Sequence, residues 1–162
     1  MILKDKIVGL SEIYVGKEGE NIITVGLGSC VGVIIYDDKN KIFGLAHIML
    51  SDSTQFKNVQ NIGKYVDLAI PELIRQVIEN GALRKNLKCK LTGGASMFNF
   101  SDTSLISDIG KRNVIKAREV LLKEKIEIIS EDVFGTKGRT ISINTSTGET
   151  FVKMVGGETK VI

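Results

Sequence analysis

The sequence predicts an α/β fold in one domain that spans residues 1–162: a layered sandwich of mixed β-sheets with two main helices packed outside. Apolar runs typical of strands outnumber helical patterns, and only two stretches show helical spacing, far apart in the chain. A regular doubly wound fold would instead alternate strands and helices along its length. With 162 residues, the chain is long enough to bury the core of one domain without disulfides.

The first strand is expected over residues 7–15, with an irregularity at Gly9, followed by a turn over residues 16–19. The next apolar run, IITVGLGSCVG at residues 22–32, is typical of a strand that ends in a tight turn and presents Cys30. The glycines beside Cys30 permit backbone angles that other residues resist, and they let another chain approach closely. This setting suits a nucleophilic thiol if a base lies nearby.

A hairpin follows, with strands expected over residues 31–36 and 41–50 and a turn over residues 37–40. Both strands are nearly continuous in apolar residues, a pattern typical of strands that are covered on both faces. We therefore expect this hairpin in the interior.

The polar stretch at residues 51–63 is long for a simple connection. It forms either the rim of a functional site or a variable surface loop, and the sequence leaves both open. A helix is expected from about residue 64 to residue 80, because apolar residues recur at helical spacing and Gly81 provides a left-handed stop. Pro71 implies either a kink or a helix whose regular part begins near Ile70.

The remaining elements complete a strand-rich chain. A second helix is expected over residues 109–125, with Val114, Ala117, Leu121 and Leu122 facing inward. The expected strands are residues 87–92, which run into the small residues of GGASMF at 93–98, then 126–133, and a hairpin of 139–144 and 149–155 joined by 145–148. A tail at 156–162 closes the chain.

The composition excludes several classes of function. Apolar residues make up 43% and charged residues 25% of the chain, as in ordinary soluble domains. The net charge is only +3, and the short basic patch at residues 84–88 lacks accompanying aromatic residues, so we expect a solvated loop there and no nucleic-acid binding. One histidine and two distant cysteines are too few ligands for a zinc site.

The sequence also indicates a compartment. Charges interrupt the apolar residues at 1–8, so we expect no signal peptide, no membrane insertion and a cytoplasmic protein. The two cysteines, Cys30 and Cys89, lie in different settings, which suits a reducing environment better than a disulfide framework.

The expected hairpin offers a base for the thiol. If the turn is tight, with Tyr36 facing Lys41, then Cys30 lies directly opposite His47. Side chains opposed in this way have Cβ atoms about 4.5–5.5 Å apart, close enough for a thiol and an imidazole to meet. A turn one residue longer would point His47 to the other face of the sheet.

A cysteine and a histidine in contact can perform acyl transfer. The thiolate is the nucleophile, a neighbouring imidazolium lowers the thiol pKa, and His47 then delivers a proton to a departing amine. Thr24 is the candidate for orienting the ring, since its oxygen can accept a hydrogen bond from the ring nitrogen that does not face Cys30. The backbone N–H groups of Gly28, Ser29 and Cys30 are candidate donors to an oxyanion.

Each of these residues also has an ordinary structural interpretation. A buried cysteine in a strand is usually a small core side chain, and we interpret Cys89 in that way. A lone histidine among apolar residues is more often a core residue than a catalyst. For Cys30, the pattern alone leaves core packing and catalysis equally open.

Four separated blocks occur in a fixed order: TVGLGSCV at 24–31, AHIML at 46–50, GGASMF at 93–98 and IGKRNV at 109–114. Together they resemble the CheD family of chemoreceptor glutamine deamidases, over nearly the whole chain. The resemblance implies hydrolysis of glutamine side chains to glutamate on the cytoplasmic helices of methyl-accepting chemotaxis receptors. Some family members also demethylate receptor glutamyl esters.

The resemblance also implies a set of residues and partners. The family's catalytic cysteine, histidine and threonine correspond to Cys30, His47 and Thr24, with no cofactor or metal. It implies a fold similar to that of deamidating necrotizing-factor toxins and a complex with the phosphatase CheC. This chain departs from the family's pattern in the loop at residues 51–62 and at Pro71, which leaves receptor selection open.

Two other classes of function remain possible on this sequence. The protein could act mainly as a binding module for CheC or receptor helices, or it could be a cysteine amidase or peptidase with another substrate. We expect a monomer, because the predicted apolar faces can be buried within one domain.

Overall fold

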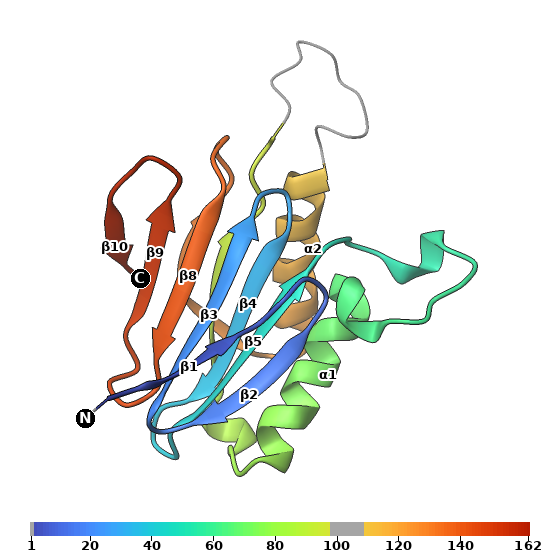
Figure 1. Cartoon of the computed structure of the whole chain (residues 1–162). Coiled ribbons are helices and arrows are strands. Elements are labelled where there is room, and N and C mark those ends of the chain that lie inside the picture. Colours follow the sequence, from blue (N-terminus) through green and yellow to red (C-terminus); the bar gives the residue numbers. More distant parts are fainter. Residues whose placement is uncertain (1, 98–108) are drawn as a thin grey trace.

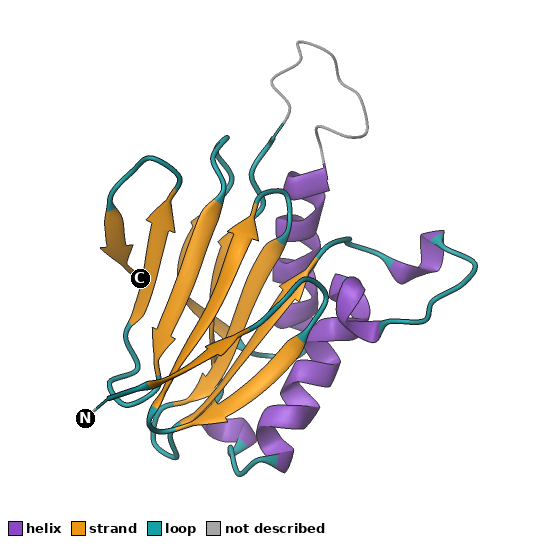
Figure 2. Ribbon diagram, viewed as in Figure 1, coloured by secondary structure: helices purple, strands orange, loops and turns teal. Residues whose placement is uncertain are grey.

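The computed structural model describes residues 2–97 and 109–162, which form three layers. One five-stranded sheet is the outer layer, a second five-stranded sheet lies in the middle, and the two long helices cover its other face (Figure 1). Figure 2 shows both helices on the same side of the strands. The predicted α/β fold, with mixed sheets and two helices outside, is confirmed.

The outer sheet combines strands from both ends of the chain. Its first pair is parallel and the other pairs are antiparallel. In spatial order, its strands are β1 (Lys4–Ile7), β3 (Glu20–Leu27), β8 (Arg139–Asn144), β9 (Thr150–Met154) and β10 (Thr159–Val161).

The inner sheet contains the predicted hairpin. In spatial order, its strands are β2 (Ile13–Lys17), β5 (Ile42–Ile48), β4 (Val31–Asp37), β6 (Lys88–Gly93) and β7 (Glu127–Val133). Every residue of β4 and β5 is buried, because the helices cover one face of these strands and the outer sheet covers the other. The expectation of an interior hairpin is therefore confirmed.

The helices are α1 (Val66–Glu79) and α2 (Ile109–Lys123). Helix α1 already begins at Val66 and contains Pro71 in its interior, so a start near Ile70 is wrong. Three short 3₁₀ helices lie between the longer elements: η1 (Ser53–Gln55), η2 (Ile62–Lys64) and η3 (Arg84–Asn86).

Two predictions of local structure are wrong. Residues 7–15 form parts of two strands in different sheets, because the chain crosses between the layers through a turn with Ser11 at a φ of 63°. Leu122 does not face inward, since it is 79% exposed. Phe98, the last residue of the GGASMF block, lies outside the described residues.

Candidate active site

Cys30 lies in the turn that joins β3 in the outer sheet to β4 in the inner sheet, directly before the first residue of β4. Its side chain is partly exposed. Gly26 adopts a φ of 73°, which favours glycine, and its carbonyl accepts a hydrogen bond from the N–H of Gly28 at 3.0 Å. The expected strand and tight turn that present a thiol are thus confirmed.

Contacts from outside the turn hold all three of its carbonyls. The N–H of Ala95 donates to the carbonyl of Gly28 at 2.9 Å, and the N–H of Gly94 donates to that of Cys30 at 2.8 Å. The side-chain amide of Asn113, on α2, donates to the carbonyl of Ser29 at 2.9 Å. The path of the backbone on both sides of the thiol is therefore fixed.

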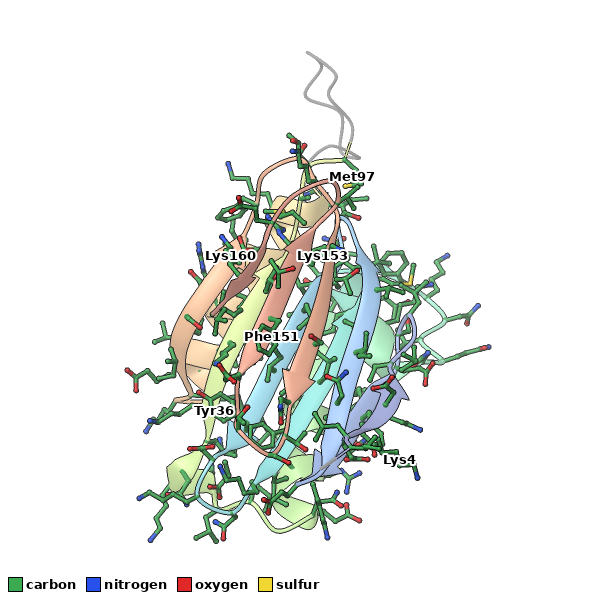
Figure 3. All side chains as sticks on the ribbon, turned by 60° about the vertical axis from the view of Figure 1, so that its left-hand side comes forward. Lys4, Tyr36, Met97, Phe151, Lys153 and Lys160 are labelled. Atoms are coloured by element: carbon green, nitrogen blue, oxygen red, sulfur yellow. The ribbon has the colours of Figure 1, made fainter. Side chains whose placement is uncertain are left out.

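Two further residues pack closely against the turn. A Cβ atom on Gly93 would lie 2.4 Å from the carbonyl oxygen of Cys30, which explains a glycine at that position. The side chain of Met97 covers Gly28, where an added Cβ would lie 3.1 Å from Met97 Cγ. Figure 3 shows Met97 at the upper end of the molecule, opposite the end at which Tyr36 lies.

His47 lies near the end of β5 and is only 3% exposed. Its backbone N–H donates to the carbonyl of Glu12, and its own carbonyl accepts from the N–H of Ser11. It pairs with Gly32 across the ladder, so the expected pairing of His47 with Cys30 is wrong.

The hairpin turns one residue later than expected because of Asp37. Asp37 pairs with Ile42 and is fully buried at the end of β4 rather than in the turn. Its carboxylate accepts hydrogen bonds from Leu83, Asn40 and Asn86. Burial raises its pKa, but these hydrogen bonds outweigh burial and lower the pKa to about 2.

This change moves the facing pairs by two residues, which keeps each side chain on its expected face. Cys30 packs against the core between the two sheets, and the ring of His47 contacts the outer sheet from the same side. Cys30 stands two residues before Gly32, the partner of His47, and just outside the ladder, so the two side chains face the outer sheet from neighbouring segments. Between them Gly32 has no side chain; a Cβ there would lie 2.6 Å from Ile141 Cδ1.

Thr24 and His47 form the expected contact. Thr24 is fully buried on β3, and its Oγ1 lies 2.7 Å from His47 Nδ1 and 2.7 Å from the carbonyl oxygen of Val8. The hydroxyl has one proton, which it donates to Val8, so it must accept the second hydrogen bond from Nδ1–H. The neutral ring therefore carries its proton on Nδ1, and Nε2 presents a lone pair.

That lone pair has no hydrogen-bond donor within residues 2–97 and 109–162. Burial lowers the pKa of His47, which keeps the imidazole neutral, and Nε2 is free to accept a proton. Burial also raises the pKa of the Cys30 thiol, although its own backbone N–H opposes this effect. The direction for the Cys30 thiol is therefore opposite to the expected lowering of its pKa.

The expected oxyanion donors are not equivalent. Gly28 is engaged, since its N–H donates to the carbonyl of Gly26. No other residue in the described parts of the chain accepts a hydrogen bond from the N–H of Ser29 or of Cys30. Among the described residues, the amides of Ser29 and Cys30 are therefore better candidates for donors to a ligand than that of Gly28.

The sequence reasoning gave Asn113 no role, although it lies in one of the four blocks. Asn113 is fully buried and donates to Met49 as well as to Ser29. Its signal in the sequence is a polar residue on the buried stripe of a helix, four residues before Ala117 and eight before Leu121.

A cavity of about 190 Å³ borders Asn113. The polar loop at residues 51–63 supplies half of its lining, which places part of this loop beside the end of α2. The lining residues are Leu50, Ser51, Asp52, Gln55, Phe56, Ile109, Arg112 and Asn113.

The second cysteine is structural. Cys89 is fully buried in the core beneath the helices, and burial raises its pKa strongly. Within the described residues, no three histidine, cysteine, aspartate or glutamate side chains are grouped as metal ligands would be. No helix in the described parts of the chain has the length and apolar character needed to span a membrane.

Comparison with known proteins identifies the family. The sequence model described as "CheD chemotactic sensory transduction" matches residues 49–154. The chain belongs to the CheD family. A "Probable chemoreceptor glutamine deamidase CheD" from Clostridium botulinum strain Hall is 50% identical over 162 residues, which cover 100% of both chains. The protein of that name from strain Alaska E43 is 50% identical over 149 residues, or 92% of each chain.

Thr24, Cys30 and His47 precede the region that the CheD family model matches, whereas the alignment to the strain Hall relative spans them. The solved structure of the hypothetical protein YfiH from Bacillus licheniformis is 12% identical with a TM-score of 0.47. It covers 80% of this chain and 59% of its own, and this low similarity does not bear on function.

Proposed function

We propose that this CheD-family chain is a protein-glutamine deamidase that hydrolyses glutamine side chains to glutamate on chemoreceptors. The observation that carries the proposal is the hydrogen bond from His47 Nδ1–H to Thr24, which leaves Nε2 as an unprotonated base on the same side of the inner sheet as Cys30. The names of the full-length relatives support the substrate, since they are described as chemoreceptor glutamine deamidases.

In the first half of the reaction, Cys30 attacks the carboxamide. The thiol proton moves to His47 Nε2 as a bond forms between Sγ and the carboxamide carbon. The oxyanion of the tetrahedral intermediate accepts hydrogen bonds from the N–H groups of Ser29 and Cys30. Nε2 then donates its proton to the leaving nitrogen, the C–N bond breaks, ammonia departs, and a thioester remains.

In the second half, water replaces ammonia. Nε2 takes a proton from the water as its oxygen attacks the thioester carbonyl, and the same two amides stabilise the oxyanion. The C–S bond breaks, the thiolate recovers the proton from Nε2, and glutamate is released. Throughout this cycle, Thr24 holds Nδ1–H, so that proton transfer is confined to Nε2.

A receptor glutamyl methyl ester would form the same thioester with methanol as the leaving group. We therefore propose methylesterase activity at this site as well. From the family resemblance we also propose a cytoplasmic monomer that binds CheC. Size-exclusion chromatography with light scattering, with and without CheC, tests the oligomeric state and the complex.

The decisive assay incubates the purified protein with a cytoplasmic receptor fragment and follows glutamine-to-glutamate conversion by mass spectrometry. The Cys30→Ala variant should show no conversion, while the matched control Cys89→Ala should retain it. Conversion by Cys30→Ala contradicts the nucleophile. Receptor binding without turnover would indicate a binding module, and peptide fragments in place of ammonia would indicate a peptidase.

A further inference from the structure

We infer that Asn113 is a positioning residue that fixes the Cys30 turn relative to the end of the strand that carries His47. Its side-chain amide has two N–H donors on one nitrogen, and both are used. One donates to the carbonyl of Ser29 at 2.9 Å and the other to that of Met49 at 2.9 Å. Ser29 precedes Cys30, and Met49 lies two residues after His47.

The β4–β5 ladder does not itself hold these two segments together. Its last pair is Val31 with Ile48, so Cys30 lies beyond it. There the two strands separate, because the N–H groups of Met49 and Leu50 both donate to the carbonyl of Lys64. The Asn113 amide bridges the segments at the point where the ladder ends.

The helix that carries Asn113 packs tightly against the segment beside the Cys30 turn. A Cβ on Gly110, one turn before Asn113, would lie 2.3 Å from the carbonyl oxygen of Ala95, so α2 packs directly against the 93–95 segment. The N–H groups of Gly94 and Ala95 donate to the carbonyls of Cys30 and Gly28. Helix α2 is thus fixed to the same turn that its asparagine contacts.

The chemistry of the side chain argues against a packing role alone. Asn113 is fully buried, and its Oδ1 has no donor among the residues that the structure describes. An unpaired buried carbonyl oxygen lowers stability, and an apolar side chain of similar shape would avoid that loss. The two N–H donors of its side chain therefore explain why an asparagine occupies position 113.

The test measures alkylation of Cys30 by iodoacetamide as a function of pH, together with kcat and KM on a receptor fragment. Asn113→Leu keeps the approximate shape and removes both donors, and Asn113→Ala removes shape and donors. Both variants should lower kcat by about 10- to 100-fold at similar KM, since small misplacements of reacting groups have effects of this order. Both should also shift the pH profile of alkylation.

The matched control is Leu121→Val, a conservative change at a fully buried position two turns further along α2. It should lower the melting temperature without shifting the alkylation profile. Wild-type kcat and an unshifted profile in Asn113→Leu would overturn the inference, and that variant decides the test if Asn113→Ala does not fold.

The kcat readout rests on the proposed function, whereas alkylation does not. A shifted profile in Asn113→Leu, in a protein whose wild type fails to deamidate receptors, would support the positioning role while contradicting the proposed function. Fully buried Cys89 should not react in the folded protein.

Discussion

The Thr24→Val substitution tests the orientation of His47, the proposed catalytic base. Valine has nearly the shape of threonine but neither accepts from His47 Nδ1–H nor donates to the carbonyl of Val8. Each of these buried groups then loses its partner at a cost of about 1–3 kcal/mol. We expect the free energy of unfolding to fall by a few kcal/mol.

The loss of activity follows from the tautomer. A hydrogen bond of about 1 kcal/mol favours Nδ1–H, and without it the Nε2–H form, which cannot accept the thiol proton, becomes several-fold more populated. Misorientation of the ring adds to this effect, up to about 100-fold. We therefore expect kcat to fall about 10- to 100-fold in Thr24→Val and to stay near wild type in Thr24→Ser, which keeps the hydroxyl.

The assay combines deamidation kinetics with ¹⁵N NMR of the imidazole. His47 is the chain's one histidine, so its ring nitrogens are assigned without ambiguity. Wild type should show a protonated Nδ1 and a bare Nε2, and Thr24→Val should show a mixture. Wild-type kcat in Thr24→Val, or a protonated Nε2 in the wild type at neutral pH, would refute the reasoning.

Two further predictions concern pH and the turn. The proposed mechanism requires a neutral His47, and burial lowers the pKa of this residue. On acidification, kcat should therefore fall only below the ordinary histidine pKa of about 6.5. A decline of kcat centred above that pH would contradict the prediction. Because the unfolded chain takes up this proton at higher pH than the folded one, unfolding free energy should also decrease as pH falls below about 6.5, measured by denaturant titration. Gly93→Ala and Gly19→Ala place alanine at φ values of 98° and 99°, but only the first adds an atom 2.4 Å from the Cys30 carbonyl. Gly93→Ala should therefore lose much more stability and activity than Gly19→Ala, and equal losses would show that backbone strain alone matters.

Much of the fold was predictable because its signals are local. Continuous apolar residues predict the buried β4–β5 hairpin, and helical spacing predicts α1 and α2. The sequence contains no comparable signal for the break between β1 and β2. The break depends on a left-handed φ at Ser11, and a serine does not predict that conformation. Strand β10 is short and exposed along its length, so it lacks an alternating pattern.

The register of the hairpin that carries His47 was not predictable from the sequence. The prediction of the turn at residues 37–40 was wrong because Leu83 and Asn86, more than 40 residues away, donate to Asp37 and hold it at the end of β4. Nothing near the hairpin encodes that contact. The face of His47 was still correct, because a shift of two residues restores the alternation of side chains.

In the proposed mechanism, a threonine as the third residue has a consequence for the protein without substrate. A carboxylate beside Nδ1 would stabilise an imidazolium and thereby favour an ion pair with the thiolate. Thr24 is neutral and gives its one proton to Val8, so it orients His47 without stabilising a positive charge. Burial acts in the same direction, since it raises the pKa of Cys30 and lowers that of His47. Both directions favour a protonated thiol in the absence of substrate, and in the proposed mechanism the oxyanion then gains the amides of Ser29 and Cys30. The proposed mechanism thus makes nucleophilic reactivity depend on bound substrate, and it predicts that Cys30 of the free protein is oxidised more slowly than a preformed thiolate would be.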